Sequence, residues 1–224
     1  MVKSRIPETD HGITGEFTTE IYDQMMRRMR DKGWLETREI LRAGISSGLA
    51  LEVGPGPGYL GLEWLKKTEG TTLKGLEISQ DMIAIAERNA REYELASRVE
   101  YVKEDAGEMP FEDDRFDAVF SNGSLHEWAH PGKILNEVAR VLKPGGRYCI
   151  TDLRRDMSFV IRWFLWLVTK PRDIRPYLIS SINASYTKDE MRNLVQETQL
   201  RGWQVGTNPI GLVLLGQRPT GGDA

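Results

Sequence analysis

Short apolar segments alternate along the chain with longer segments whose apolar residues recur at helical spacing. The short segments have the length and composition of buried strands, and they cover residues 49–53, 72–78, 99–102, 116–120 and 147–152. The intervening segments with helical spacing are 59–67, 79–94 and 131–142. Strictly alternating strands and helices predict a parallel sheet that is covered by helices on both faces.

The pattern changes near the C-terminus. Thr187 to Glu190 has the composition of a capping box, which predicts a helix reaching about Leu200. Residues 203–207 and 210–217 then read as two strands, and a link as short as Asn208-Pro209 can only form an antiparallel hairpin. The expected fold is therefore α/β, with a doubly wound, Rossmann-like sheet of seven strands that ends in an antiparallel hairpin.

Two segments stand outside this alternation. Residues 1–16 are polar and contain Gly12 and Gly15, so we expect a mobile arm ahead of a single domain formed by 17–224. Residues 157–186 separate the fifth strand from the last helix and are rich in Trp and Phe. We expect this insertion to be a helical cover over the sheet or its mouth.

Composition narrows the class of protein. The chain of 224 residues is 40% hydrophobic with a net charge of -3, which fits a globular domain without general attraction to nucleic acid. The single cysteine, Cys149, permits no internal disulfide and no cysteine zinc cluster, so we expect no metal and a cytoplasmic location. The longest apolar run, 159–168, is too short for a transmembrane span and contains Arg162.

The main candidate for chemistry is the glycine-rich turn 51–58, which directly follows the first strand. Glycines at such a turn let the backbone approach a ligand closely. A dinucleotide site would need a third glycine where Tyr59 stands, so that pattern fails. The spacing Glu52-x-Gly54-x-Gly56-x-Gly58 instead resembles the first motif of class I S-adenosylmethionine-dependent methyltransferases.

The resemblance covers about residues 34–217 and continues in order along the chain. It implies that Glu77 accepts hydrogen bonds from the ribose hydroxyls, that Asp105 holds the adenine amino group, and that 121–126 lies under the methionine part. Val141-Leu142-Lys143-Pro144-Gly145-Gly146 resembles the family's turn before its fifth strand, and the hairpin is the family's topological mark. The implied cofactor-binding residues are Glu52, Gly54, Pro55, Gly56, Gly58, Glu77, Ile78, Asp105, Ala106, Ser121 and Asn122.

The resemblance further implies an enzyme of class EC 2.1.1.- that methylates a small molecule, similar to the quinone and sterol methyltransferases, with S-adenosylhomocysteine as product. Two alternatives stay open: an RNA- or protein-directed methyltransferase, and a non-catalytic cofactor-binding subunit of a complex. The motif Asp/Asn-Pro-Pro-Tyr/Phe of adenine and glutamine amide methylation is replaced by Ser121-Asn122-Gly123-Ser124, which disfavours those substrates.

Residues for the acceptor side are harder to identify. His126 is the candidate catalytic base because it follows the fourth strand and imidazole titrates near neutrality; a purely structural histidine is the alternative. Tyr22 is a second candidate, since an aromatic ring suits a sulfonium. The aromatic and basic segment 159–175 could bind a hydrophobic or anionic acceptor, touch a membrane surface, or form core or a homodimer contact.

Overall fold

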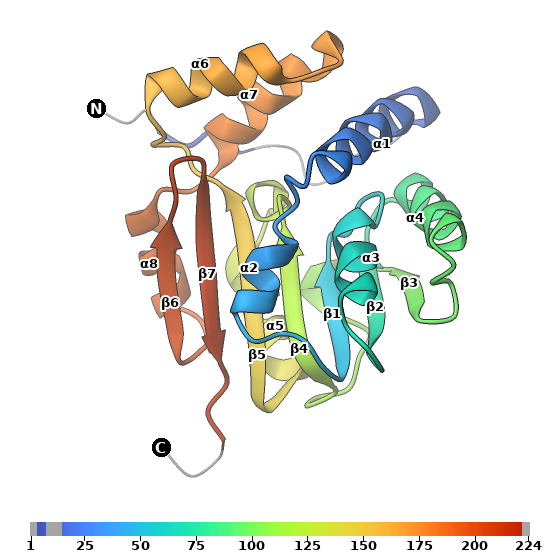
Figure 1. Ribbon diagram of the computed structural model, residues 1–224. Helices are drawn as coiled ribbons and strands as arrows, with labels where there is room; N and C mark the ends of the chain where they lie inside the picture. The colour runs from blue at the N-terminus through green and yellow to red at the C-terminus, as the bar shows by residue number, and fades with distance from the viewer. Residues whose placement is uncertain (1–3, 8–14, 221–224) are drawn as a thin grey trace.

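One seven-stranded sheet forms the centre of the computed structural model, which describes residues 4–7 and 15–220 (Figure 1). The strand order is β3-β2-β1-β4-β5-β7-β6, in which β7 runs antiparallel to both β5 and β6 and the other pairs are parallel. The strands are β1 (Leu49–Val53), β2 (Thr72–Glu77), β3 (Val99–Lys103), β4 (Phe116–Asn122), β5 (Leu142–Leu153), β6 (Trp203–Thr207) and β7 (Gly211–Gln217). The predicted fold class, including the antiparallel hairpin, is confirmed.

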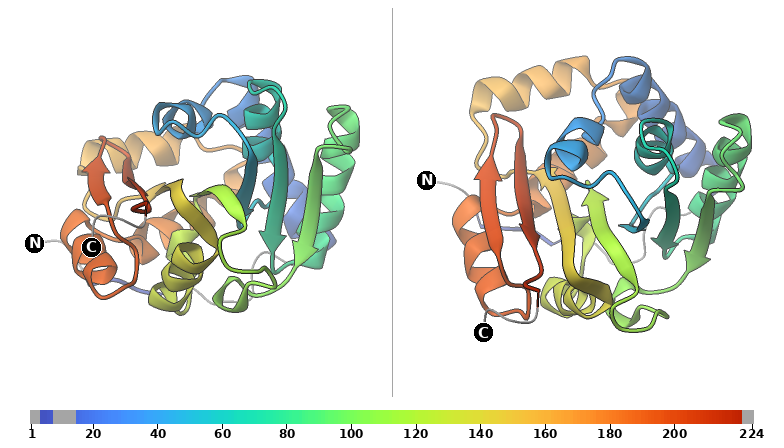
Figure 2. Two further views of the ribbon diagram at one scale, coloured as in Figure 1. Left: turned by 90° about the horizontal axis from the view of Figure 1, so that it is seen from below. Right: turned by 60° about the horizontal axis from the view of Figure 1, so that its bottom comes forward.

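Helices cover both faces of the sheet, as Figure 2 shows for α2 and α3 on one side and α5 and α8 on the other. The α-helices are α1 (Glu16–Asp31), α2 (Thr37–Arg42), α3 (Tyr59–Lys66), α4 (Gln80–Glu92), α5 (Pro131–Val141), α6 (Phe159–Val168), α7 (Arg175–Ala184) and α8 (Lys188–Gln196). Three short 3-10 helices are η1 (Ala106–Glu108), η2 (Leu125–Glu127) and η3 (Arg172–Ile174). Within the described residues, no helix is both long and apolar enough to cross a membrane.

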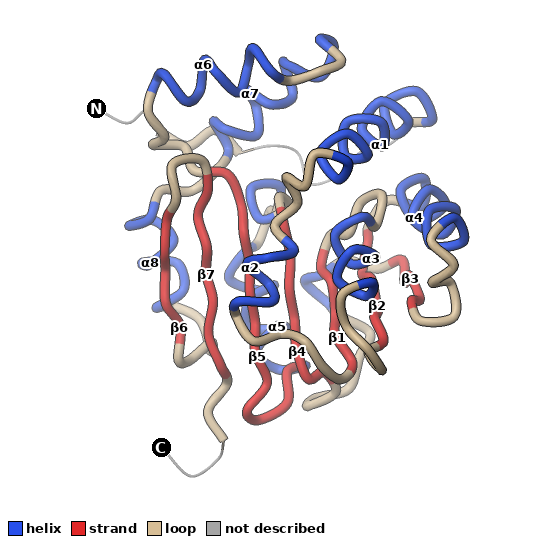
Figure 3. Tube along the Cα trace, in the orientation of Figure 1, coloured by secondary structure: helices blue, strands red, loops and turns tan. Residues whose placement is uncertain are grey.

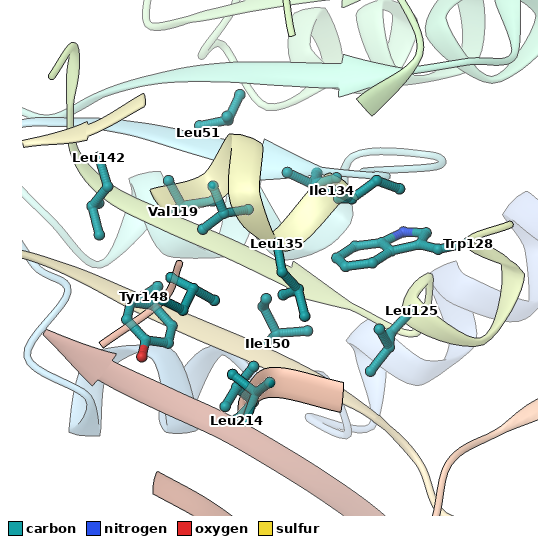
Figure 4. Close-up of a cluster of buried hydrophobic side chains, with 14 of the residues drawn as sticks. Leu51, Val119, Leu125, Trp128, Ile134, Leu135, Leu142, Tyr148, Ile150 and Leu214 are labelled. Carbon is teal, nitrogen blue, oxygen red and sulfur yellow. The ribbon is translucent and has the colours of Figure 1, made fainter. Parts of the chain in front are cut away.

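Each face of the sheet carries its own core. Figure 4 shows part of the first, where Leu135 of α5 meets Val119, Tyr148 and Ile150 from the strands. The second core joins α1, α2 and α3 to the opposite face, where Trp64 is fully buried against Phe120. Cys149 is buried in this second core, and burial raises the pKa of its thiol to about 12. The cores hold rigid the strand ends from which the site is built.

Local sequence signals account for most element boundaries. Ser79 caps α4 by accepting a hydrogen bond from the backbone of Met82, and Thr187 and Glu190 form the predicted capping box of α8. Some boundaries were wrong. Helix α8 ends at Gln196, before the expected Leu200. Strand β5 was expected at 147–152 but begins at Leu142, which pairs with Phe116 across a register shift. The Pro-Gly-Gly turn therefore bulges within the ladder instead of preceding it (Figure 3).

The insertion 157–186 is helical, as expected, and contains α6, η3 and α7. Its role as a cover for an acceptor, and the boundary of the domain at residue 17, stay predictions. Residues 8–14 of the expected mobile arm lie outside the described residues. Of the remainder, Arg5 lies over the Tyr186 ring at 4.3 Å, and Ile6 donates a backbone hydrogen bond to Asn183.

Candidate functional site

Polar residues at the ends of several strands surround a cavity of about 420 Å³, which lies at the carboxyl edge of the parallel strands. The strand order reverses between β1 and β4, which is where open α/β sheets bind ligands. Of the residues predicted for the site, those in its lining are Tyr22, Glu52, Gly54, Pro55, Gly56, Glu77, Ile78, Asp105, Ala106 and Asn122. The other three, Gly58, Ser121 and His126, lie outside the lining.

The glycine turn between β1 and α3 depends on residues without a side chain. Gly54, Gly56 and Gly58 have φ angles of 67°, 52° and 82°, in the left-handed region that favours glycine. A Cβ on Gly54 would lie 2.7 Å from Cβ of Ser124, and one on Gly58 only 2.5 Å from the Tyr101 hydroxyl. Gly58 thus serves the packing of the α3 N-terminus, whereas Gly56 faces the cavity beneath the ring of Tyr22.

Glu77 ends β2 and holds the turn in place. Its Oε2 accepts a hydrogen bond from the Gly56 backbone N–H at 3.0 Å, and its Oε1 accepts one from Ser79 at 3.0 Å. The side chain is buried, and burial raises the pKa of its carboxyl. Each carboxylate oxygen has more than one acceptor site, so Glu77 keeps capacity for hydroxyl donors that enter the cavity.

Glu52 lies one strand away and is also buried, with 2% of its surface exposed. Its Oε2 has no hydrogen-bond partner among the described residues. Burial, and then the neighbouring Glu77, raise the pKa of the Glu52 carboxyl to about 8. Two buried carboxyl groups at one end of the cavity make this end suited to a cationic or hydrogen-bond-donating ligand.

The opposite wall follows β3 and is more open. Asp105 is exposed and accepts a hydrogen bond from the Gly107 backbone through Oδ1 at 2.7 Å, which forms an Asx turn. Its neighbour Ala106 and the half-exposed Ile78 also line the cavity. This wall therefore combines the carboxylates of Glu104 and Asp105 with small and apolar side chains, which suits a flat heteroaromatic ring.

The end of β4 forms the floor. Ser121 is buried beneath the glycine turn and donates to the Val53 carbonyl at 2.7 Å, which explains its place outside the lining. Asn122 lines the cavity, and its Oδ1 accepts a hydrogen bond from Thr151 at 2.8 Å. The adjacent Ser121 and Asn122 therefore have different tasks, since successive side chains of a strand point to opposite faces.

Helix α1 closes one side of the cavity with Tyr22 and Met26. Between them, Asp23 is buried and accepts hydrogen bonds from the Tyr59 hydroxyl at 2.9 Å and from the amide of Asn89 at 3.0 Å. Asn89 also donates to the Pro57 carbonyl at 2.9 Å. This network joins α1 to α3, α4 and the glycine turn, so the position of Tyr22 is coupled to the turn.

His126 belongs to η2, one layer behind the cavity. Its Nδ1 lies 2.9 Å from Oδ1 of Asp152, and its backbone N–H donates to Oδ2 of Asp152 at 2.7 Å. Both side chains are buried, and Nε2 lies 3.8 Å from Oε1 of Glu127, which does line the cavity. A carboxylate on Nδ1 fixes the tautomer and orientation of an imidazole, as in catalytic dyads.

Some lining residues were missed by sequence reasoning. His130 and Lys133 line the cavity from the start of α5, and neither was among the residues predicted for the site. The position of His130 just before Pro131 was available as a signal, because a helix N-terminus at this edge must face the ligand. Trp128 is mostly buried in the core yet also lines the cavity, and an isolated Trp gives no such signal.

Comparison with known proteins assigns the domain. Residues 51–150 match the profile of the family described as "Methyltransferase domain". This region is that of a methyltransferase domain, and the sheet that contains it has the class I methyltransferase fold. The matched region runs from within β1 to within β5 and so contains the walls of the cavity contributed by the ends of β1, β2, β3 and β4.

Curated relatives of this methyltransferase domain cover about half of the chain. It is 34% identical over 113 residues to the methyltransferase GfsG of Streptomyces halstedii, and 38% identical over 114 residues to a fatty-acid O-methyltransferase of Mycolicibacterium smegmatis. A UbiE-type ubiquinone/menaquinone biosynthesis C-methyltransferase of Cereibacter sphaeroides is 23% identical over 66% of the chain. The matched region spans only 40%, 40% and 64% of these relatives, respectively.

The fold is also found among solved structures. A SAM-dependent methyltransferase from Aquifex aeolicus superposes with a TM-score of 0.63, covering 82% of this chain and 89% of its own at 20% identity. At this identity the likeness establishes the fold alone.

The cavity residues of the methyltransferase domain fit S-adenosylmethionine. Gly56 leaves space that a Cβ would fill, and the buried carboxylate of Glu77 retains acceptor sites for a ribose diol. Glu52 lines the same end of the cavity, and its buried Oε2 lies against Gly61 of α3. Asp105 can accept from an exocyclic amine.

Proposed function

We propose that the chain binds S-adenosylmethionine in this cavity and transfers its methyl group to a small-molecule acceptor. One observation carries the proposal: a single cavity joins the glycine turn after β1, Glu77 at the end of β2 and Asp105 after β3. Glu77 would hold the ribose, Asp105 the adenine amino group, and Asn122 the methionine side. When bound, the cofactor supplies a methyl group already activated by a sulfonium.

The protein's part is to position the acceptor and exclude water. Tyr22 and Met26 would close the cofactor from the α1 side, and the Tyr22 ring suits a neighbouring cation. Trp128 and Ile134 add apolar walls. These features favour an apolar or partly apolar acceptor, and the fatty-acid and quinone-type relatives supply the first compounds to try.

For an acceptor with an O–H or N–H group, we propose His126 as the base that takes the proton, held by Asp152 as a positioning residue. The ionised Asp152 would stabilise the imidazolium formed. Glu127 lies between His126 and the cavity, so the proton would pass from the acceptor to His126 through Glu127 or through a water molecule. His126→Ala should lower kcat on the true acceptor by about 100-fold, within the usual range for a general base, without changing cofactor affinity. Unchanged turnover would assign His126 to structure alone.

The test of cofactor binding is calorimetric titration of the purified chain with S-adenosylhomocysteine, with NAD as control. We expect micromolar binding of the first and none of the second, followed by methyl transfer from labelled S-adenosylmethionine to a long-chain fatty acid or a demethylated quinol. Binding without transfer to any small molecule would favour the macromolecular or non-catalytic alternatives. Binding of neither ligand would overturn the proposal.

A further inference from the structure

Helix α6 exposes its apolar side chains and directs its one charged side chain toward the protein. None of its ten residues is buried, although the helix is almost entirely apolar. Its one charged side chain, Arg162, donates to Oδ1 of Asn183 on α7 at 2.6 Å, so the charge is directed at the protein. The exposed side chains are Phe159 (81%), Val160 (70%), Trp163 (54%), Phe164 (52%), Trp166 (40%) and Leu167 (46%).

These six residues make up one surface, the α6 outer face. They recur at spacings of three and four, which places them along one broad side of the helix. Tyr177 of α7 is 58% exposed and extends the apolar character to the neighbouring helix. A helix on a water-facing surface normally turns its polar side outward, so the α6 outer face requires an apolar partner.

The charges around the α6 outer face indicate which partner. Six basic side chains lie in residues 154–175. Three of them bond within the protein, Arg154 to Asp156, Arg155 to Glu190 and Arg162 to Asn183. The other three, Lys170, Arg172 and Arg175, follow α6. Lys170 and Arg172 are exposed directly after the helix, and Arg175 stacks on Trp166 at 4.2 Å. Exposed aromatic side chains bordered by Lys and Arg match the interface of an anionic lipid bilayer, where rings enter the headgroup boundary and cations meet phosphates.

A second copy of the chain fits this surface less well. In a two-fold symmetric dimer the same patch meets itself, so the basic side chains of both copies would share one interface. Asp173 is the one acidic residue between 157 and 186. The basic excess would therefore stay uncompensated in such a dimer, whereas anionic headgroups neutralise it.

From these observations we propose that the α6 outer face binds anionic lipid surfaces. The helix lies beyond the carboxyl edge of β5, on the same edge of the sheet as α1 and the cavity (Figure 1). The docked chain would thus present its cavity edge to the lipid. The proposal concerns binding and does not depend on the chain being a methyltransferase.

The experiment is co-sedimentation of the full chain with vesicles, either of phosphatidylcholine alone or of equal parts phosphatidylcholine and phosphatidylglycerol. We expect binding to the mixed vesicles that weakens with salt, and about tenfold less binding to the neutral ones. Trp163→Glu should reduce binding to the mixed vesicles about tenfold or more. The matched control is Trp34→Glu, because Trp34 is 51% exposed but lies between α1 and α2.

A second variant tests the charges without altering apolar packing. Lys170→Glu with Arg172→Glu should abolish the preference for phosphatidylglycerol while leaving the melting temperature unchanged. Absence of vesicle binding, or equal loss in Trp34→Glu, would overturn the proposal. So would a dimer in solution that Trp163→Glu dissociates. Titration with S-adenosylhomocysteine on the same samples reports the cofactor site separately, so failure of either proposal is visible alone.

Discussion

The two ends of the carboxyl edge differ in how their polar groups are held. Over β2 and β4 the backbone fixes polar groups: Glu77 accepts from two N–H donors, and Ser121 donates to the Val53 carbonyl. Over β5, helix α6 directs its one charged side chain, Arg162, at α7 and exposes apolar side chains. Binding of one defined cofactor requires particular polar side chains at particular positions, and such a site leaves a recognisable motif in the sequence. A surface that binds variable apolar molecules does not require specific residues and leaves no motif.

The comparison predicts that damage to the cofactor end affects cofactor affinity most strongly. Gly56→Val places a β-branched side chain at a φ of 52° and beneath Tyr22, where a Cβ would lie 3.6 Å from the ring. We expect affinity for S-adenosylhomocysteine to fall about 100-fold or more, which is roughly 3 kcal/mol. Gly206→Val is the control, since Gly206 lies in β6 with free space around it. Equal affinity in the two variants would contradict the role given to the turn.

A smaller effect is expected from Glu77→Ala. The substitution removes the proposed ribose acceptor and the partner of the Gly56 N–H, which together should weaken binding of S-adenosylhomocysteine about 10- to 100-fold. Glu100→Ala on the neighbouring strand serves as control, because Glu100 is largely exposed and pairs with Lys74. If calorimetry finds the same affinity in Glu77→Ala as in the parent chain, Glu77 does not bind the ribose.

The buried carboxyl of Glu52 predicts a pH dependence of stability. Its pKa is raised from an ordinary 4.5 to about 8, so the folded state binds more protons than the unfolded state between these values. The free energy of unfolding should therefore fall as pH rises through this window, by at most about 1.4 kcal/mol per pH unit from this group. Urea denaturation at several pH values measures the slope.

Glu52→Gln should reduce that slope, and the exposed Glu69→Gln should leave it as in the parent chain. Glu77 adds a slope of the same sign, because burial raises its carboxyl pKa too. A parent stability that rises between pH 5 and 8 would conflict with the burial of both acids.

The smallest expected effect concerns the hydrogen bond that joins α1 to α3 beside the cofactor end. Tyr59→Phe removes one hydrogen bond to Asp23 and should lower the free energy of unfolding by about 1 kcal/mol. Because Asp23 lies between Tyr22 and Met26, we also expect a few-fold weaker cofactor binding. Tyr177→Phe, on the exposed surface of α7, should change neither quantity. Thermal unfolding and titration of the two variants make the comparison.

The same contrast explains what the sequence could predict. Strand ends with Gly, Glu and Asp are readable because their backbone conformation or burial demands those residues, and so the positions of Gly56, Glu77 and Asp105 around one cavity could be expected. The sequence does not reveal the direction that the backbone takes after β4. That direction decides that Asn122 lines the cavity while Ser121 does not, and that His130 belongs to the lining. The almost uniformly apolar sequence of α6 predicted either a core helix or a cover over the site. Its exposure could not be predicted, because the sequence does not reveal whether an apolar helix packs on its own chain or on a partner.

Glu77 and Asp105 are proposed to hold opposite ends of one nucleoside. A crystal structure of the chain with S-adenosylhomocysteine is the decisive measurement. We expect both ribose hydroxyls within hydrogen-bond distance of the Glu77 carboxylate, and the adenine amino group at Asp105. A ligand bound elsewhere, or a nucleoside that touches neither carboxylate, would contradict it.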